Sequence, residues 1–199
     1  MHPKKLWILA ICFFTGISIV DAQIPARRLD TSMKVGKAGY RVSCTNRNPD
    51  RNNITINPLG FEKDAREFSF EIKGRIAKTE VDDINHDGYP DLVIYVFNND
   101  SIPKGNVIGI CSDKNESVMP VAFPDIFDDP KIRAGYKGND VYFLMEGYLV
   151  RRFPVYRTEG ASAAPATGTL MRQVTYQVVN DERGGYKFKP LRSNDFTRP

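Results

Sequence analysis

The stretch that decides the fold reads Asp83-Ile84-Asn85-His86-Asp87-Gly88-Tyr89-Pro90-Asp91 and runs directly into Leu92-Val93-Ile94-Tyr95-Val96-Phe97. Its first part sets side-chain oxygens at alternating positions and places a glycine where the chain must bend. Its second part is apolar on both faces and rich in β-branched and aromatic residues, which is typical of a fully buried strand. An oxygen-rich turn therefore leads into the strand that we expect at the centre of a sheet.

The turn has two interpretations, a calcium site and a ligand-free turn. Calcium takes about six to eight oxygen ligands. The candidate ligands are the side chains of Asp83, Asn85, Asp87 and Asp91 and the backbone carbonyl of Tyr89. Without an ion, Asp83 and Asn85 would accept hydrogen bonds from their own backbone, and Gly88 would supply a positive φ. Because carboxylates this close repel one another without a cation, the sequence favours a structural Ca²⁺ ion.

The N-terminus predicts export. Lys4 and Lys5 precede an apolar run over residues 6–20, and small residues follow at the right places for cleavage before Gln23. Residues 1–22 are therefore predicted to be a signal peptide, and the apolar run is too short to span a bilayer. We expect a periplasmic or secreted protein, with a flexible lead-in over residues 23–39 and a single β domain over residues 40–199.

Composition excludes some functions and leaves other questions open. The 28 basic and 24 acidic residues give a net charge of +4, and no concentrated basic footprint points to nucleic acid. After the signal peptide the chain keeps two of its three cysteines, Cys44 and Cys111, and one of its two histidines, His86. These residues lack the arrangement that nucleophilic catalysis needs, so we do not expect an enzyme. In an oxidising compartment the two cysteines can form a disulfide, but the sequence does not show whether their Cα atoms come close enough. It also leaves open a homodimer.

The rest of the chain is rich in short strand patterns. Period-two alternation or short apolar runs between turn residues predict strands at residues 41–45, 54–56, 68–73, 92–97, 107–111, 141–145, 148–150, 153–156, 174–178 and 186–188. One short helix is expected within residues 125–136, capped by Asp128 or Asp129 before Pro130. The expected fold is therefore all-β, an antiparallel sandwich or barrel-like sheet of about eight to ten strands with at most one short helix.

Three stretches carry a resemblance to a known family. They are residues 80–91; Ala134-Gly-Tyr-Lys-Gly-Asn-Asp140; and Glu146-Gly-Tyr-Leu-Val-Arg-Arg-Phe-Pro-Val-Tyr-Arg157. Over residues 40–190 the chain resembles the periplasmic inhibitors of invertebrate-type lysozyme (the PliI family). The resemblance implies a secreted β-sandwich that blocks lysozyme by inserting a loop into the substrate cleft, and so a binding protein whose partner is lysozyme.

The resemblance also points to the inserted loop, within residues 98–106. The family carries a Ser-Gly-x-Tyr segment there, which falls on residues 101–104; Ser101 matches it, whereas Ile102 and Lys104 differ. With Asn99 and Asp100, Ser101 and Lys104 form the candidate partner-binding loop. Two other interpretations stay open: a merely solvated hairpin tip, and a calcium-stabilised extracellular binding or adhesion module with an unrelated ligand.

Two consecutive arginines follow in the same resembling region. Arg151 and Arg152 point to opposite faces of a strand, so at most one of them faces the core. We expect that one to form a structural ion pair with an acid such as Glu146.

Overall fold

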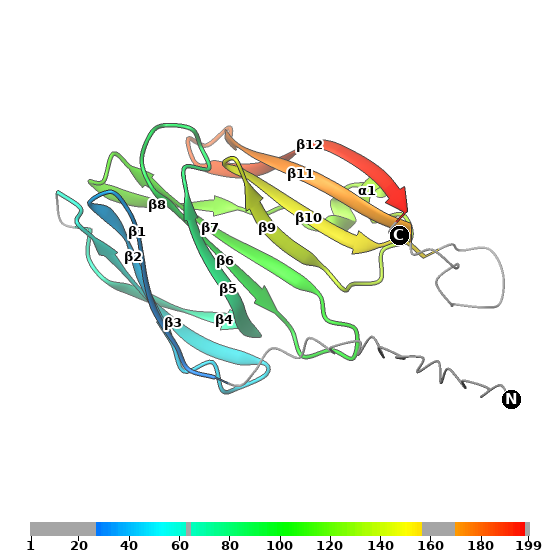
Figure 1. Ribbon diagram of the computed structural model, residues 1–199, viewed down its shortest axis with the longest axis horizontal. Helices are drawn as coiled ribbons and strands as arrows, with labels where there is room; N and C mark the ends of the chain where they lie inside the picture. Colours follow the sequence, from blue (N-terminus) through cyan, green and yellow to red (C-terminus); the bar gives the residue numbers. More distant parts are fainter. Residues whose placement is uncertain (1–26, 63–64, 157–169, 198–199) are drawn as a thin grey trace, which may run out of the picture.

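The computed structural model describes residues 27–62, 65–156 and 170–197. This part of the chain forms twelve strands, a single 3-10 turn (η1, Ile126–Asp128) and one short helix (α1, Pro130–Arg133) (Figure 1). The all-β prediction is confirmed, with more strands than the eight to ten expected. The predicted signal peptide, residues 1–22, lies outside the described residues.

The strands form two sheets. The smaller sheet has the order β1-β2-β3-β4, and all its neighbours are antiparallel. Its strands are β1 (Leu29–Val35), β2 (Ala38–Cys44), β3 (Arg51–Leu59) and β4 (Phe68–Lys73). In Figure 1 this sheet, in blue and cyan, covers one part of the larger sheet.

The larger sheet has eight strands in the order β5-β6-β7-β8-β12-β11-β10-β9. Its strands are β5 (Arg75–Asp82), β6 (Asp91–Phe97), β7 (Gly105–Asp113), β8 (Ser117–Ala122), β9 (Val141–Met145), β10 (Tyr148–Pro154), β11 (Leu170–Asn180) and β12 (Tyr186–Thr197). Neighbours are antiparallel except β8 and β12, which pair in parallel over two residues. The sheet therefore joins two antiparallel halves through one short parallel contact.

The expected lead-in over residues 23–39 is wrong where the structure describes it. Leu29–Val35 form β1, an edge strand that pairs antiparallel with β2 through a turn at Gly36. Leu29, Thr31 and Met33 are half-buried while their neighbours are exposed, and Leu29 and Met33 pack against the core. The alternation was present in the sequence, but the small and polar residues between these positions masked it.

Two further strands were also missed, for different reasons. In β5 the register shifts between Ile76 and Lys78, and such a bulge breaks the period-two pattern. In β8, Pro120 argues against a strand in a sequence pattern, yet it is paired with Ile110 of β7. Local irregularity thus hid two strands that tertiary pairing supports.

The core consists of two apolar clusters on opposite faces of β6 and β7. Leu92, Ile94 and Val96 face the smaller sheet, whereas Val93 and Tyr95 face the interior of the larger, curved sheet. All five side chains are at most 3% exposed. The prediction that β6 is a central, fully buried strand is confirmed, and its two faces serve two different cores.

The two edges of the larger sheet approach each other through Glu80 of β5. Its Oε2 accepts hydrogen bonds from the Leu144 N–H of β9, at 2.9 Å, and from the Tyr95 hydroxyl, at 2.6 Å. Glu80 also pairs with Lys78. Although burial opposes it, the hydrogen bonds from Lys78, Tyr95 and Leu144 hold the pKa of Glu80 below its ordinary value. One carboxylate thus links strands that share no backbone ladder, and the sheet becomes nearly barrel-shaped (Figure 1).

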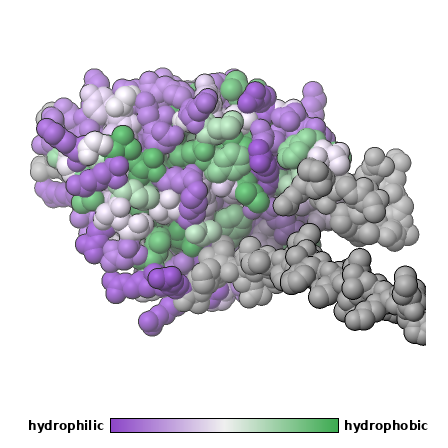
Figure 2. Space-filling model, in the orientation of Figure 1, coloured by the Kyte–Doolittle hydropathy of each residue, from purple (hydrophilic) through white to green (hydrophobic). Residues whose placement is uncertain are grey.

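The two helical turns lie where the sequence placed one short helix. Asp125 caps η1 by accepting the Phe127 N–H, and Asp129 caps α1 by accepting the N–H groups of Lys131 and Ile132. Among the described residues no helix has the length and hydrophobicity needed to cross a membrane. Figure 2 shows hydrophilic residues around the rim of one face and hydrophobic residues gathered near its middle.

Candidate partner-binding loop

The candidate loop joins β6 to β7, and Asn98 makes three hydrogen bonds at its base, two of which cross to the other limb. The Asn98 N–H donates to the Lys104 carbonyl at 3.2 Å, and the Lys104 N–H donates to Asn98 Oδ1 at 2.8 Å. The Asn98 side-chain amide also donates to Asp100 Oδ2 at 2.6 Å. Asn98 therefore bonds to both limbs, which fixes the width of the loop.

The tip of the loop is exposed. Asn99, Asp100, Ser101 and Lys104 all face solvent, and Ile102 is 39% exposed. Within the described part of the chain no hydrogen bond forms on the Ser101 hydroxyl. The four residues proposed from the sequence are thus brought together on one projecting segment, where their side chains are accessible to a partner.

The second limb of the loop is braced by the segment that precedes β9. The Asn139 N–H donates to the Pro103 carbonyl at 2.8 Å, and the Gly105 N–H donates to Asp140 Oδ2 at 2.9 Å. Gly138 lies so close that a Cβ there would be 2.9 Å from the Pro103 carbonyl oxygen. In the sequence this segment was marked only by its resemblance to the lysozyme inhibitors, whereas in the structure it supports the loop.

Behind this brace lies a buried ion pair. Arg151 Nε donates to Asp140 Oδ1 at 2.8 Å, and the two side chains are 3% and 0% exposed. The Tyr136 hydroxyl donates to Asp140 Oδ2 at 2.6 Å. The guanidinium carbon of Arg151 lies 4.9 Å from the centre of the Tyr136 ring and 5.4 Å from that of Phe153. Asp140 thus links the loop backbone directly to the core.

The charges of this pair affect the pKa values around them. Although burial opposes it, Tyr142 and Asp140 raise the pKa of Arg151 above its ordinary value. Burial, together with the charge of Asp140, raises the pKa of the Tyr136 hydroxyl. Arg151 therefore stays cationic and Tyr136 stays a hydrogen-bond donor across the physiological pH range.

The predicted partner of the buried arginine was wrong. Arg151 does face the core, as expected for one of the two arginines, but it pairs with Asp140 instead of Glu146. In the β9–β10 register Arg151 lies opposite Tyr142, close to the start of β9, whereas Glu146 occupies the hairpin turn at the other end. Arg152, on the opposite face, donates from Nε to the Gln173 side chain at 2.7 Å.

The sequence did contain a signal for this cluster. Leu149, Arg151 and Phe153 occupy alternating positions of β10, and all three are buried. A charged residue in the apolar half of an alternating strand predicts a buried, paired charge. The sequence could not reveal which acid would reach it.

A cavity of about 410 Å³ opens beside the loop. Lys104, Gly105 and Asn106 form one wall. The other lining residues are Phe123, Pro124, Asp125, Ile126, Phe127, Tyr136 and Arg151. The cavity therefore lies between the loop, the 3-10 turn and the buried ion pair.

The acidic turn of residues 83–91 lies before β6, at the opposite end of that strand from the loop. Asp83 accepts the N–H groups of Asp87 and Gly88, at 3.0 and 2.9 Å, and Asp87 accepts that of Tyr89 at 2.9 Å. Asn85 Oδ1 accepts the Asp87 N–H at 3.2 Å. Gly88 has a φ of +88°. These are the contacts expected of a turn that bonds to its own backbone.

Asp91 lies beneath this turn and is fully buried. Its carboxylate accepts the N–H groups of Ser112, Ile84 and Asn85, at 2.7, 3.0 and 3.3 Å. Burial raises the pKa of Asp91 to about 7, against the opposing effect of these three donors. Asp91 thus fastens the turn to β7.

The turn as it stands is not an assembled metal cage. Across residues 27–62, 65–156 and 170–197, no three His, Cys, Asp or Glu side chains converge in a way that could hold a metal ion. The four side chains proposed as ligands, those of Asp83, Asn85, Asp87 and Asp91, instead accept backbone hydrogen bonds. Calcium binding therefore stays a prediction of the sequence.

The open question of the disulfide is answered by the geometry of β7. Cys44 and Cys111 are both free and buried. Cys44 lies in the cluster under the smaller sheet, and Cys111 lies in the cluster inside the larger sheet. Ile110, the neighbour of Cys111 on β7, points into the same cluster as Cys44, whereas Cys111 points to the other face. The larger sheet therefore separates the two cysteines. Burial raises the pKa of both thiols, which makes them poor nucleophiles.

No protein-family model matches this chain, and no curated protein does either.

Proposed function

We propose that this protein is a periplasmic or secreted inhibitor of lysozyme, with the invertebrate type as the favoured target. It acts as a binding protein, not as an enzyme, and inserts the loop of residues 98–106 into the substrate cleft. The sequence resemblance suggests this function, and the geometry of the loop supports it. Export through the predicted signal peptide would bring it to the compartment where lysozyme attacks peptidoglycan.

The observation that carries the proposal is a loop that is exposed at its tip and fixed at both limbs. Asn98 bonds across its base, and Asn139 and Asp140 hold its second limb from the side. A loop that is already ordered loses little conformational entropy when it enters a cleft, and such preorganisation raises affinity. The contacts that hold the loop, which include the buried ion pair of Asp140 with Arg151, favour a binding loop over a merely solvated hairpin tip.

The exposed groups suit the chemistry of a lysozyme cleft. Lysozyme acts through two carboxyl groups on either side of the scissile bond. The Ser101 hydroxyl can donate a hydrogen bond to one of them, and the Lys104 ammonium can form a charge-assisted contact with the other. Occupation of both carboxyl groups would exclude the substrate.

One observation favours a second candidate function. Ile102, at 39% exposure, presents an apolar side chain at the loop tip, where the resembling family has glycine. The same rigid loop could then serve a calcium-stabilised extracellular binding module with a different ligand.

A titration separates the two functions. Residues 23–199 are added to purified invertebrate-, chicken- and goose-type lysozymes while cell-wall lysis is followed. We expect inhibition of at least the invertebrate type, and the double variant Ser101→Ala/Lys104→Ala should abolish it without lowering the melting temperature. Absence of inhibition of all three enzymes at micromolar concentration would leave only the second function.

A further inference from the structure

The strand β4 has an open edge. Within the described part of the chain it pairs with β3 on one side and with no strand on the other. The other three edge strands are in contact with one another. The Thr79 hydroxyl of β5 donates to the Met33 sulfur of β1 at 3.3 Å, and Glu80 of β5 accepts a hydrogen bond from β9. An open edge strand presents backbone N–H and C=O groups that can pair with another chain.

The sequence of β4 lacks the features that block an open edge. Proline, a β-bulge or a charge on the inward face prevents pairing with another chain. The strand reads Phe68-Ser-Phe-Glu-Ile-Lys73, without proline, and it pairs with β3 in one unbroken register. Its inward side chains are apolar: Ile72 is buried, and Phe68 and Phe70 are half-buried against the core under the smaller sheet. The edge is therefore able to accept a further strand.

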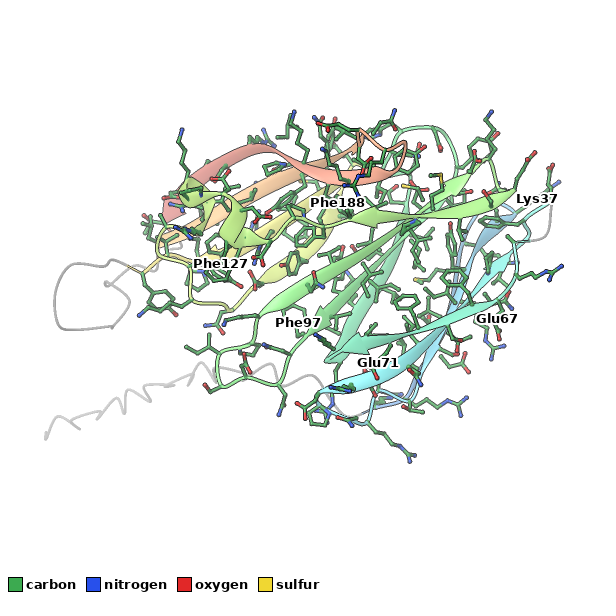
Figure 3. All side chains as sticks on the ribbon, turned by 180° about the vertical axis from the view of Figure 1, so that it is seen from behind. Lys37, Glu67, Glu71, Phe97, Phe127 and Phe188 are labelled. Carbon is green, nitrogen blue, oxygen red and sulfur yellow. The ribbon has the colours of Figure 1, made fainter. Side chains whose placement is uncertain are left out.

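The outward face of β4 carries opposite charges at its two ends. Ser69, Glu71 and Lys73 alternate along this face and are exposed, and so is Glu67, which immediately precedes the strand. Figure 3 shows Glu67 and Glu71 spaced along the smaller sheet. Glu71 lies 4.0 Å from Arg51 of β3, whereas Glu67 and Lys73 form no ion pair among the described residues. An acid at one end and a base at the other are thus available to a partner strand.

These charges select one register for pairing with a second copy of the chain. Residues paired in an antiparallel ladder have their side chains on the same face, so a two-fold axis must pass through a residue. An axis at Ser69 would place Glu67 opposite Glu71, and an axis at Glu71 would place that glutamate opposite itself. An axis at Phe70 instead places Glu67 opposite Lys73 of the second copy, twice by symmetry. Opposite charges across strands stabilise a pair, and like charges destabilise it.

We infer that this edge is an interface between two copies of the chain, formed by antiparallel pairing of β4 about Phe70. The strand itself identifies the occupant, because its charges complement a reversed copy of the same strand in this register. The contact uses the same surface on both copies, as two-fold dimers do, and it joins the two four-stranded sheets into one. It does not depend on lysozyme binding, so it can fail or succeed separately from the proposed function.

Charge reversal tests the interface in the protein of residues 23–199. Sedimentation equilibrium over a range of concentrations should show a reversible dimer. Glu67→Lys and Lys73→Glu should each weaken the dimer by roughly tenfold, because both symmetric contacts become repulsive. The double variant Glu67→Lys/Lys73→Glu should restore it. Lys34→Glu, at an exposed position of β1, is the matched control and should dimerise like the unmodified protein.

Disulfide cross-linking tests the register. With the axis at Phe70, residue 69 of one copy lies opposite residue 71 of the other, close enough for a disulfide. A mixture of Ser69→Cys and Glu71→Cys should therefore cross-link on mild oxidation, and neither variant should do so alone; the native Cys44 and Cys111 are buried. A monomer at every concentration, or a dimer that the single charge reversals leave unchanged, would overturn the interface. Cross-linking of either cysteine variant alone would overturn the register.

Discussion

Arg151 and Asp140 form an ion pair of 2.8 Å in the interior of the larger sheet, and the second oxygen of Asp140 accepts the N–H of Gly105 at the root of the exposed loop. A buried charge is thereby coupled to a surface segment through a single carboxylate. The stability of the fold and the shape of the loop depend on the same residue.

Removal of the negative charge should destabilise the protein strongly. Asp140→Asn leaves the Arg151 guanidinium without a counter-charge in the core, and loss of one member of a buried pair costs about 3–5 kcal/mol. Denaturant unfolding at pH 7 measures the change. The double variant Asp140→Asn/Arg151→Met should recover part of the loss, because no unpaired charge remains. A single variant as stable as the wild type would show that the pair contributes little.

The loop brace can be tested at Gly138. This residue has a φ of +118°, and a Cβ there would be 2.9 Å from both the Pro103 carbonyl oxygen and the Ile102 side chain. Gly138→Ala should therefore displace the loop and weaken lysozyme inhibition by roughly tenfold, since loss of preorganisation lowers affinity. Gly184→Ala is the matched control, because Gly184 also has a positive φ but has nothing within 4 Å.

In that comparison both alanine variants share the backbone strain of a positive φ, which costs of order 1 kcal/mol. Only Gly138→Ala should change inhibition. Equal inhibition by the two variants would mean that the contact between Gly138 and the loop does not fix the loop's active shape.

Closure of the larger sheet by Glu80 predicts a dependence on acid pH. The pKa of Glu80 is lower in the folded protein than its ordinary value of 4.5, so the folded state favours the ionised form. This stabilisation is present above the unfolded pKa and is lost as the pH falls below it, through the folded pKa. Unfolding followed between pH 7 and pH 3 should show this loss.

The Glu80→Gln variant should lose this contribution at pH 7 already. We expect a destabilisation of about 1–3 kcal/mol, because buried donors lose a charged acceptor, and a flatter dependence on pH below about 4.5. Glu71→Gln, at an exposed position of β4, serves as control. If the free energy of unfolding of Glu80→Gln depends on pH as that of the wild type does, the loss of stability in acid comes from other carboxylates.

Calcium binding by the acidic turn has a direct thermal test. Asp83, Asp87 and Asp91 lie within one short segment, and a bound cation would relieve their repulsion. We expect millimolar Ca²⁺ to raise the melting temperature above that of chelator-treated protein, because a ligand selective for the folded state stabilises it. Asp83→Asn/Asp87→Asn should abolish the difference. An identical melting temperature with and without calcium would support the ligand-free turn.

The two cysteines predict insensitivity to reducing agents. Cys44 and Cys111 are free and lie on opposite faces of the larger sheet, so a reductant should leave the melting temperature of residues 23–199 unchanged. A thiol reagent should titrate both cysteines in denaturant and react slowly with the native protein. A drop in melting temperature on reduction would reveal a disulfide.

Much of the fold could be predicted because alternation along a strand is a local signal. The unbroken apolar run at residues 92–97 predicted a strand, β6, that is buried on both faces. In the structure each face of β6 packs into a different core. Strands whose pattern was broken, such as β5 with its bulge at Ile76, could not be found in this way.

The candidate site was predictable only in part. The sequence placed Ser101 and Lys104 on an exposed connection between two strands. The brace by Asn139 and Asp140 and the cavity shared with Phe127 depend on contacts between segments far apart in the chain. No periodicity reports such contacts.

The sequence by itself determined an all-β chain with a buried central strand, an acidic turn before that strand and a polar loop after it. Tertiary structure alone decided that Arg151 pairs with Asp140, that Glu80 links the sheet edges, and that Cys44 and Cys111 lie apart. The reason is physical. Residues two positions apart on a strand point to the same face of the sheet, so the pattern of burial can be read from a short segment of sequence. The partner of a buried charge is instead whichever group the strand order brings within reach.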